Sequence, residues 1–440
     1  MELPKNVLYC IELLEAAGYP AYAVGGCVRD WLLGLTPHDY DLCTAATPEI
    51  IQKVFSKHSL VLNGVKHGTV GVIFPEGVVE ITTFRTEGGY ADGRHPDWVR
   101  FAPTIQEDLS RRDFTVNAMA YSPTRGLVDP FDGQEDLKSK TLRAVGQPAL
   151  RFQEDSLRIL RGVRFAVRFG LEPDLATEAA MLGQAPLMDM LARERVFDEF
   201  CKLLPLVSAK DLIRFGRILT QPIPELANAI GFDQRSPHHA YDLFTHTAYV
   251  TEAVPPDLPL RWAALLHDVG KVPCFTTDEN GRGHFYGHAR TGADLADGIL
   301  RRLKAPNALR EQVVALIELH MTRLEPDRSI LRRRLSRLGQ ATVEQMLLLQ
   351  EADMGSKGTG NEEELEIFPQ IRQLLQQIIA ENACLKISDL AVDGKDLLAL
   401  GYPAGPQLGQ CLNHLLEQVV EETLPNEKAP LLHAAEAFLS

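Results

Sequence analysis

Two aspartates, Asp39 and Asp41, stand one residue apart in the segment HDYDLCTAATPEI, residues 38–50. If this segment is a strand, both side chains leave the same face, because alternate residues of a strand project to one side. Adjacent carboxylates repel each other unless a cation lies between them, and Mg²⁺ prefers carboxylate oxygens together with substrate phosphates. Two such ions can hold the attacking and leaving oxygens of a phosphoryl transfer. The pair therefore predicts a magnesium site for such chemistry.

Residues on either side of the aspartate pair suit the same chemistry. Glu80, in VVEITTF, is expected to come from an adjacent strand and to complete the carboxylate set. Gly25 and Gly26 stand between a predicted strand and a predicted helix, where backbone amides can approach a triphosphate, and Arg29 follows them. Each motif alone is typical of a strand end or a turn. Their order and closeness favour a nucleotide site.

The elements that must position these residues alternate between helix and strand over 1–140. A helix is predicted over 5–17, and TVGVIF and VVEITTF around a short turn predict a hairpin. From about residue 141 the pattern is helical almost throughout, as in LARERVFDEFCKLL and LREQVVALIELHM. The sequence predicts an α+β head followed by a long helical body.

Composition limits the class of protein. The chain has 440 residues, 45% apolar and 24% charged, without an apolar run long enough to span a membrane and without a signal-peptide pattern. Its seven cysteines are single and unpatterned, which indicates reduced thiols and predicts a cytoplasmic location. The net charge of −14 argues against a non-specific polyanion binder, although residues 151–170 carry five arginines against two acids.

Motifs over residues 21–170 resemble those of the class II tRNA nucleotidyltransferase and bacterial poly(A) polymerase group, in the polymerase-β-like superfamily. The matching segments are GGCVRD, HDYDLCTAATPE, EITTFRTEGGYADGRHPDWVRF, RRDFTVNAMAY, LVDPFDGQEDL, LRAVG and RFQEDSLRILRGVRFAVRFG. The resemblance implies a small polymerase-β-like nucleotidyltransferase head with a mixed sheet, an elongated all-helical body, and metal ions held by Asp39 and Asp41. It also implies that the loop in RTEGGYADGRHPDW, residues 85–98, accompanies adenosine addition.

Two further segments concern the nucleotide itself. Arg112, Asp113 and Asn117 lie in RRDFTVNAMAY, where arginines can bind phosphates and Asp or Asn can bond a ribose hydroxyl. The resemblance implies that this segment recognises the ribose and the triphosphate.

Base selection is predicted for EDSLRILRGVRF. Asp155 and Arg158, three apart on a predicted helix, would lie side by side. An acceptor beside donors matches cytosine and adenine, which each present an exocyclic amine next to a ring acceptor. Arg161 is a second candidate in the same pocket. A pair at this spacing is also common as a surface salt bridge of little energetic value.

Histidines in the helical body indicate a second metal site. His246, His267 and Asp268 resemble an HD domain, a metal-dependent phosphohydrolase fold, over roughly 236–322, and His288 and His320 lie nearby in the sequence. A further aspartate commonly closes such sites, but the sequence does not place it here. A structural helical domain with hydrogen-bonded histidines is an equally supported alternative.

Together with these patterns, the resemblance implies template-independent addition of C, C and A to the 3′ end of tRNA from CTP and ATP, with Mg²⁺ as cofactor. The expected partners are tRNA and the two nucleotides, without a membrane or an obligate protein partner. The alternatives are an A-adding enzyme or poly(A) polymerase, and an HD phosphohydrolase with an RNA-binding head. The predicted parts are a catalytic head (1–140), a neck that recognises the base (141–230), an HD-like body (231–330) and a tRNA-binding tail (331–440), whose LRRRLSRLG segment is basic.

Overall fold

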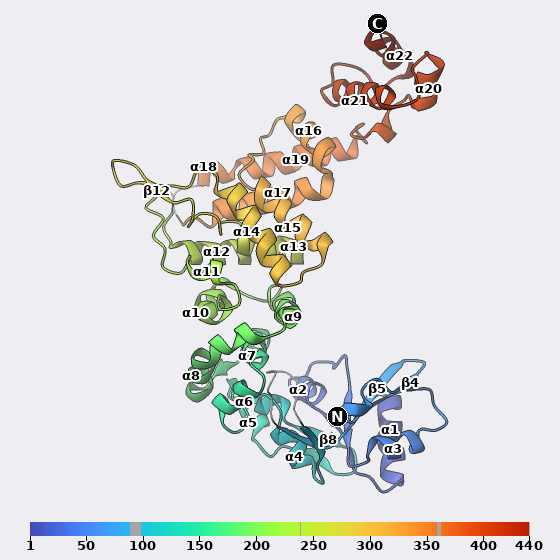
Figure 1. The fold of residues 1–440 in the computed structure, drawn as a ribbon, viewed down its shortest axis with the longest axis vertical. Helices are drawn as coiled ribbons and strands as arrows, with labels where there is room; N and C mark the ends of the chain where they lie inside the picture. The colour runs from blue at the N-terminus through green and yellow to red at the C-terminus, as the bar shows by residue number, and fades with distance from the viewer. Residues whose placement is uncertain (89–97, 238, 359–361, 440) are drawn as a thin grey trace. The chain divides into compact units, whose positions relative to one another are not determined.

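The computed structural model describes residues 1–88, 98–237, 239–358 and 362–439. The chain forms two compact units (Figure 1). Unit 1 comprises residues 1–207 and 214–227, and unit 2 comprises 208–213 and 228–440. Within the described part of the chain, no helix combines the length and the apolar character needed to cross a bilayer. The loop residues 89–97, to which the sequence assigned adenosine addition, lie outside the described residues.

Unit 1 is built on a seven-stranded mixed sheet with the order β3-β4-β5-β2-β1-β8-β9. The central strands β2 and β5 run parallel, and the other neighbours in this sheet run antiparallel. The strands are β1 (Ala21–Val24), β2 (Asp41–Thr44), β3 (Leu60–Val61), β4 (Thr69–Phe74), β5 (Gly77–Thr83), β8 (Ala120–Ser122) and β9 (Gly126–Val128). The antiparallel pair β4 and β5 confirms the predicted hairpin.

Helices cover one face of this sheet and part of the other. Helices α1 (Lys5–Ala16) and α3 (Pro48–Val54) pack on one face, where Ile11, Leu14 and Ile51 are fully buried. On the other face, α4 (Ile105–Ser110) contributes Ile105 and Leu109 to a core with Cys43. Cys43 follows Asp41 by two residues and so lies on the same face of β2. This core therefore begins next to Asp41 and holds the strand that carries it in place.

The remaining elements of unit 1 are mostly short helices. They are α2 (Gly26–Leu32), η1 (Val65–His67), η2 (Thr115–Asn117), α5 (Gly133–Lys138), α6 (Pro148–Glu154), α7 (Leu157–Phe169), α8 (Leu175–Gln184), η3 (Ala185–Met190), α9 (Arg193–Leu203) and α11 (Pro224–Ala227). Two small strand pairs join β6 (Arg85–Gly88) to β7 (Trp98–Phe101) and β10 (Thr141–Leu142) to β11 (Glu172–Pro173). Helix α10 (Ala209–Leu219) is divided between the two units.

Unit 2 is almost wholly helical. Its elements are α12 (Leu243–Ala253), α13 (Leu258–Leu266), β12 (Thr276–Thr277), β13 (Gly283–His284), α14 (His288–Arg302), α15 (Asn307–Leu319), α16 (Arg328–Leu338), α17 (Gln340–Gly355), α18 (Glu362–Leu365), α19 (Ile367–Ala380), η4 (Ile387–Asp389), α20 (Gly394–Ala399), α21 (Pro406–Val420) and α22 (Lys428–Leu439). Helices α12, α13, α15 and α17 pack together, and the last helices share a separate core that includes Leu415 and Leu431. The predicted mixed-sheet head and helical body are confirmed.

Two details differ from the sequence prediction. Strand β2 begins at Asp41, so Asp39 lies in the loop before the strand rather than on it. The helix predicted through EDSLRILRGVRF is broken, because α6 ends at Glu154 and α7 starts at Leu157. Between them Asp155 is extended, with φ −147° and ψ 101°, and its Oδ1 accepts a hydrogen bond from the amide of Leu157 at 3.1 Å. Aspartate favours such positions because its carboxylate satisfies the unpaired amides of a helix start.

Candidate active site

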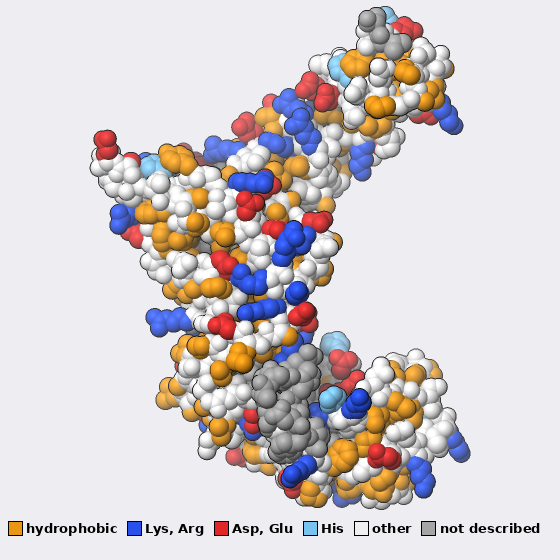
Figure 2. Space-filling model, viewed as in Figure 1, with side chains coloured by type: hydrophobic (Ala, Val, Ile, Leu, Met, Phe, Trp, Pro, Cys, Tyr) orange, Lys and Arg blue, Asp and Glu red, His pale blue; other side chains and the backbone are white. Residues whose placement is uncertain are grey.

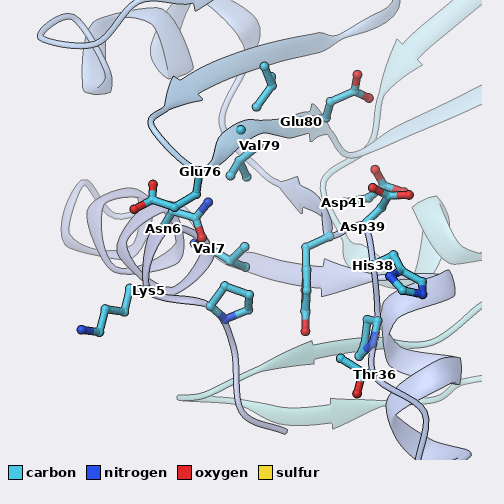
Figure 3. A pocket seen from close by; sticks show the side chains of 15 residues that line it. Lys5, Asn6, Val7, Thr36, His38, Asp39, Asp41, Glu76, Val79 and Glu80 are labelled. Atoms are coloured by element: carbon cyan, nitrogen blue, oxygen red, sulfur yellow. Dashed lines mark hydrogen bonds between the residues drawn. The ribbon is translucent and has the colours of Figure 1, made fainter.

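Three carboxylates line a cavity of about 960 Å³ at the start of β2 and β5 (Figure 3). Asp41 and Glu80 are direct neighbours on these parallel strands, so their side chains leave the same face of the sheet. Asp39 reaches the same cavity from the loop before β2, and Figure 3 shows its carboxylate beside that of Asp41. The structure therefore brings together the three predicted carboxylates, although strand geometry accounts only for Asp41 and Glu80.

The charges around Asp41 suit a bound cation. Desolvation raises the pKa of Asp41 above its ordinary value, Arg112 opposes this rise, and Asp39 adds to it. A raised pKa means that the ionised form lacks sufficient positive charge nearby, which a divalent ion would supply. Oxygen donors alone form the set, as hard divalent ions require. The residues present thus fit a divalent metal ion.

Arg112 lies near Asp41 and also near the glycine turn. Gly25 has φ +79°, and a Cβ there would come within 2.8 Å of Nη1 of Arg112, so only glycine lets the guanidinium approach this closely. Fully buried Asp108 on α4 helps to place this guanidinium, at 3.4 Å, and also binds Arg111. Asp108 is a supporting residue that the sequence analysis missed. The amide of Gly25 donates to the carbonyl of Met119 at 3.0 Å, so Gly26 and Arg112 remain to offer an amide and a guanidinium to an anion beside Asp41.

Arg29 does not have the arrangement that the sequence predicted. Its side chain is buried and donates to Oδ1 of Asp30 at 2.6 and 2.8 Å and to Oδ1 of Asn117 at 2.5 Å. Its guanidinium also lies 4.3 Å from the centre of the Phe169 ring. These hydrogen bonds show that Arg29 positions Asn117, and a direct contact of Arg29 with a triphosphate stays a prediction.

Asp113, Asn117 and Arg161 form one hydrogen-bonded group. Oδ1 of Asp113 accepts from Nδ2 of Asn117 at 3.1 Å, and Oδ2 accepts from Nε of Arg161 at 2.8 Å. Burial alone would raise the pKa of Asp113, but Arg161 and Arg158 outweigh it and lower that pKa to about 2. Asp113 is therefore ionised at neutral pH and can accept a hydroxyl hydrogen bond.

The predicted base-selecting pair is not a simple pair along one helix. Arg158 on α7 donates to Oε2 of Glu154 at 2.8 Å and to the carbonyl of Arg111 at 3.0 Å. The two carboxylate oxygens of Asp155 instead accept hydrogen bonds from the guanidinium of Arg195 on α9, at 3.1 and 2.8 Å. The expected side-by-side placement on a helix is wrong because the helix breaks at Asp155. Arg195 was missed, since it follows Asp155 by 40 residues and only the packing of α9 on α7 brings it there.

The geometry just described suits transfer of a nucleotide. The carboxylates can hold divalent ions, Arg112 lies beside them, and the carbonyl next to Arg112 binds Arg158, so the metal and base-reading segments form one connected framework. Known proteins support the same reading. The family model described as "Poly A polymerase head domain" matches residues 21–143, and that described as tRNA nucleotidyltransferase domain 2 matches residues 288–435.

The CCA-adding enzyme of Latilactobacillus sakei is 34% identical over 433 residues, 98% of this chain and 97% of the relative. The chain belongs to the CCA-adding enzyme family. The CCA-adding enzyme of Streptococcus suis is 33% identical over 436 residues, 99% of this chain and 97% of the relative.

Solved structures of CCA-adding enzymes share the fold. A crystal structure of the Bacillus stearothermophilus CCA-adding enzyme in complex with CTP has TM-score 0.72 and 29% identity, covering 99% of this chain and 98% of that one. The Thermotoga maritima CCA-adding enzyme complexed with tRNA has TM-score 0.61 and 21% identity, covering 99% and 95%. This chain is a nucleotidyltransferase, and enzymes of this kind use a divalent metal ion, which its carboxylate set fits.

A second group of side chains that could hold a metal ion lies within unit 2 of this CCA-adding enzyme family member. We call it the histidine–aspartate cluster: His246, His267, Asp268, His288, His320 and Asp353. Asp353 on α17 is the acid that the sequence could not place, and its Oδ1 lies 3.0 Å from Nε2 of His246. Nε2 of His246 and of His267 are buried and make no hydrogen bond among the described residues, although carboxylate oxygens lie near both, and Oδ2 of Asp268 lies 2.7 Å from Nζ of Lys271. A buried imidazole nitrogen without a hydrogen bond is costly, so these two nitrogens are candidate metal ligands.

Proposed function

We propose that this protein adds C, C and A in turn to the 3′ end of tRNA, using CTP and ATP and releasing pyrophosphate. The observation that supports this most directly is the cavity where Asp39, Asp41 and Glu80 meet beside Arg112. Relatives named CCA-adding enzyme that match nearly the whole chain, and the CTP complex of a relative that shares the fold, support this assignment.

In this reaction the oxygen of the tRNA 3′ hydroxyl bonds to the α-phosphorus while the bond to pyrophosphate breaks. We assign Mg²⁺ to Asp39 and Asp41, with Glu80 completing the carboxylate set; when bound, such ions stabilise negative charge on the reacting oxygens. Arg112 and the amide of Gly26 bind the triphosphate, and Gly25 contributes the positive φ of the turn, since its own amide donates to Met119.

The ribose and the base are bound by the network that continues from Arg112. Asp113 and Asn117 accept from and donate to the ribose hydroxyls, with Arg161 and Arg29 fixing their orientation. Asp155 accepts from the exocyclic amine of cytosine or adenine. Arg195 engages each oxygen of Asp155 once, and because a carboxylate can accept about four hydrogen bonds, capacity for the amine remains.

Arg158 supplies the complementary donor for the ring nitrogen. It donates three hydrogen bonds, to Glu154 and to the carbonyls of Arg151 and Arg111, and a guanidinium has five N–H groups. Uracil and guanine present a donor where Arg158 also donates, which leaves two donors facing each other. The two residues thus favour C and A without a template strand.

Poly(A) polymerase is the competing activity, since selection of A uses the same residues. Incubation with tRNA that lacks its 3′ CCA, with CTP alone, ATP alone and both together, separates the two. We expect two C additions with CTP and one further A when both are present. Incorporation of A without C, or of long A tails, would exclude the proposal.

The arrangement of the chain into head, neck, HD-like body and tRNA-binding tail also belongs to this proposal, as does its cytoplasmic location.

The basic segment of α16 contributes less free charge than its sequence suggests. Arg332 is buried and donates to the carbonyls of Val419 and Val420 at 2.9 Å, and exposed Arg333 pairs with Glu421. On the face drawn in Figure 2, basic and acidic side chains of unit 2 are interspersed. We assign tRNA contact to this surface through individual arginines rather than a continuous basic patch.

A further inference from the structure

Two phenylalanines of α7, Phe165 and Phe169, lie against the arginines that orient the ribose-binding group. We propose that this ring pair sets the selection of ribonucleotides over 2′-deoxyribonucleotides, because it fixes the planes of those guanidinium groups. The inference rests on the proposed function, in which Asp113 and Asn117 bind the ribose. It adds two residues that act through others, and both are therefore positioning residues.

One face of α7 connects base selection with ribose binding. Residues three or four apart on a helix share a face, so four side chains of α7 form a single row. They are Arg158, Arg161, Phe165 and Phe169. Arg158, which we assign to the base, begins the row, and Arg161 donates to Oδ2 of Asp113 at 2.8 Å. The two rings follow toward the end of the helix, so one helix carries the residues for both parts of the nucleotide.

The two rings contact both arginines that hold the ribose-binding group. The ring centroids of Phe165 and Phe169 are 6.1 Å apart, and the ring planes differ by 24°. The guanidinium carbon of Arg29 lies 4.3 Å from the Phe169 centroid and 5.4 Å from the Phe165 centroid. That of Arg161 lies 5.2 Å from the Phe165 centroid. A guanidinium over a ring is attracted by the negative charge of the ring face, so the pair stabilises both groups.

Hydrogen bonds alone leave the guanidinium of Arg29 able to tilt. Its Nε and one terminal nitrogen both donate to a single oxygen, Oδ1 of Asp30, at 2.8 and 2.6 Å, and the other terminal nitrogen donates to Oδ1 of Asn117 at 2.5 Å. A pair that uses both carboxylate oxygens fixes a guanidinium plane, whereas one acceptor atom acts as a pivot. The group can therefore tilt about the line that joins the two acceptor oxygens. The ring of Phe169 limits that tilt.

Burial strengthens this contact. The side chain of Arg29 is buried, and desolvation lowers the pKa of its guanidinium, although Asp30 opposes this effect. Phe165 is buried and Phe169 is half-buried. The attraction between a cation and an aromatic ring is larger where water is excluded, so these contacts contribute more than similar contacts at an exposed surface.

The orientation of Arg29 determines that of the Asn117 amide. A guanidinium only donates, so it must face the amide oxygen, and the amide nitrogen then donates to Oδ1 of Asp113 at 3.1 Å. One N–H of that nitrogen remains for the ribose. Asp113 is held in turn by Arg161, which the Phe165 ring contacts. Tilt of either guanidinium therefore misplaces the donor and the acceptor that a 2′ hydroxyl needs.

Selection of ribonucleotides depends on that geometry. A ribonucleotide and its 2′-deoxy analogue differ only in the 2′ hydroxyl, and a site built to hydrogen-bond a hydroxyl discriminates against an analogue that lacks it. When the donor and the acceptor are misplaced, the ribonucleotide loses its contact, while the deoxyribonucleotide has no such contact to lose. Removal of the ring should therefore affect the two nucleotides unequally.

The test measures kcat/KM for addition of one C to tRNA that lacks its 3′ CCA, with CTP, 2′-deoxy-CTP and 3′-deoxy-CTP. Phe169→Leu keeps an apolar side chain and removes the ring face. We expect kcat/KM for CTP to fall about tenfold, as for loss of a desolvated cation–π contact, with less than about a twofold change for 2′-deoxy-CTP. 3′-Deoxy-CTP keeps the 2′ hydroxyl and should lose as much as CTP.

Three further variants separate the ring face from general packing. Phe169→Tyr keeps a ring and should keep the preference of the parent protein for CTP. Phe169→Met lacks a ring, as the leucine variant does, and covers the case in which that variant does not fold. Phe55→Leu removes a fully buried ring at the end of α3 that packs beside His58, and it should leave the preference unchanged. Thermal melting of each variant shows whether it is folded.

Equilibrium binding of CTP and 2′-deoxy-CTP without tRNA separates this inference from the proposed function. Failure of the parent protein to add C overturns the proposed function, whereas tighter binding of CTP that Phe169→Leu removes still supports the role of the rings. Equal binding of the two nucleotides by the parent protein overturns the inference. So does a preference that the leucine and methionine variants retain, an equal loss for both nucleotides, or a tyrosine variant that behaves as the leucine variant does.

Discussion

Replacement of Arg195 by alanine should weaken base selection, although in our proposal Arg195 positions Asp155 and makes no contact with the nucleotide itself. Arg195 holds both oxygens of Asp155, at 3.1 and 2.8 Å, and the two side chains are only 22% and 17% exposed. A hydrogen bond to a charged group contributes roughly 1.5–3 kcal/mol, and partial solvent screening reduces the value of the pair to about 2 kcal/mol. Since 1.4 kcal/mol corresponds to tenfold, kcat/KM for CTP and ATP should fall about 30-fold.

The assay is single-nucleotide incorporation into tRNA ending before C or before A, with UTP as a third nucleotide. Incorporation of UTP should stay unchanged, because Asp155 offers no favourable contact to uracil at that position, so selectivity falls by the same factor. Arg193→Ala on α9, which removes a hydrogen bond to the carbonyl of Asp189, is the matched control.

A double-mutant cycle tests whether Arg195 acts through Asp155. In an Asp155→Ala background the Arg195→Ala change should have almost no further effect, since its partner is absent. An undiminished 30-fold loss in that background would refute the reasoning, as would equal losses for CTP and UTP. Thermal melting of each variant separates these results from unfolding.

Three further changes test other parts of the fold and site. Asp41→Asn should lower single-turnover incorporation of C by at least about 1,000-fold, equivalent to roughly 4 kcal/mol, because the divalent-ion set loses a charged ligand. Asp113→Asn should lower the free energy of unfolding by about 2 kcal/mol at pH 7, because the pKa of Asp113 in the folded protein, about 2, lies below its ordinary value of 3.8. Urea titrations should show this difference between the two proteins from pH 4 upward, and the difference should disappear as the pH falls toward 2. Arg332→Met should destabilise the C-terminal helices by about 1–3 kcal/mol, seen as faster proteolysis near Val419 and Val420, whose carbonyls lose their donor.

The sequence predicts those features that depend on local pattern. The hairpin that carries Glu80 follows from alternating β-branched residues around a short turn, and the glycine turn and aspartate motif follow from spacing. The break at Asp155 was missed even though a local signal exists. Asp-Ser before an apolar run is typical of a helix start, and giving that signal more weight than the surrounding helical pattern would have placed the boundary correctly.

Residues that act from distant segments could not be predicted in the same way. Asp353 follows His320 by 33 residues and reaches the cluster only because α17 packs beside α12, where the carbonyl of Ser356 also binds His246. Asp108 has the pattern of an ordinary first-turn acid of α4, and its full burial under two arginines emerges only from tertiary packing. Aspartates are common in the sequence, and only the fold determines which of them reaches the cluster or supports the arginines.

The pairing of arginines in unit 1 explains how a chain of net charge −14 can bind anionic substrates. Each arginine of the nucleotide-binding framework has an acidic partner: Arg29 with Asp30, Arg112 with Asp108, Arg158 with Glu154, Arg161 with Asp113, and Arg195 with Asp155. These partners neutralise charge, so they weaken non-specific attraction for polyanions, and they also fix the guanidinium planes before the nucleotide arrives. The acidic partners thus lower the affinity for an arbitrary polyanion and hold the guanidinium groups in a fixed orientation. A site that must distinguish C and A from U and G without a template needs that orientation more than it needs charge, because hydrogen-bond geometry carries the discrimination.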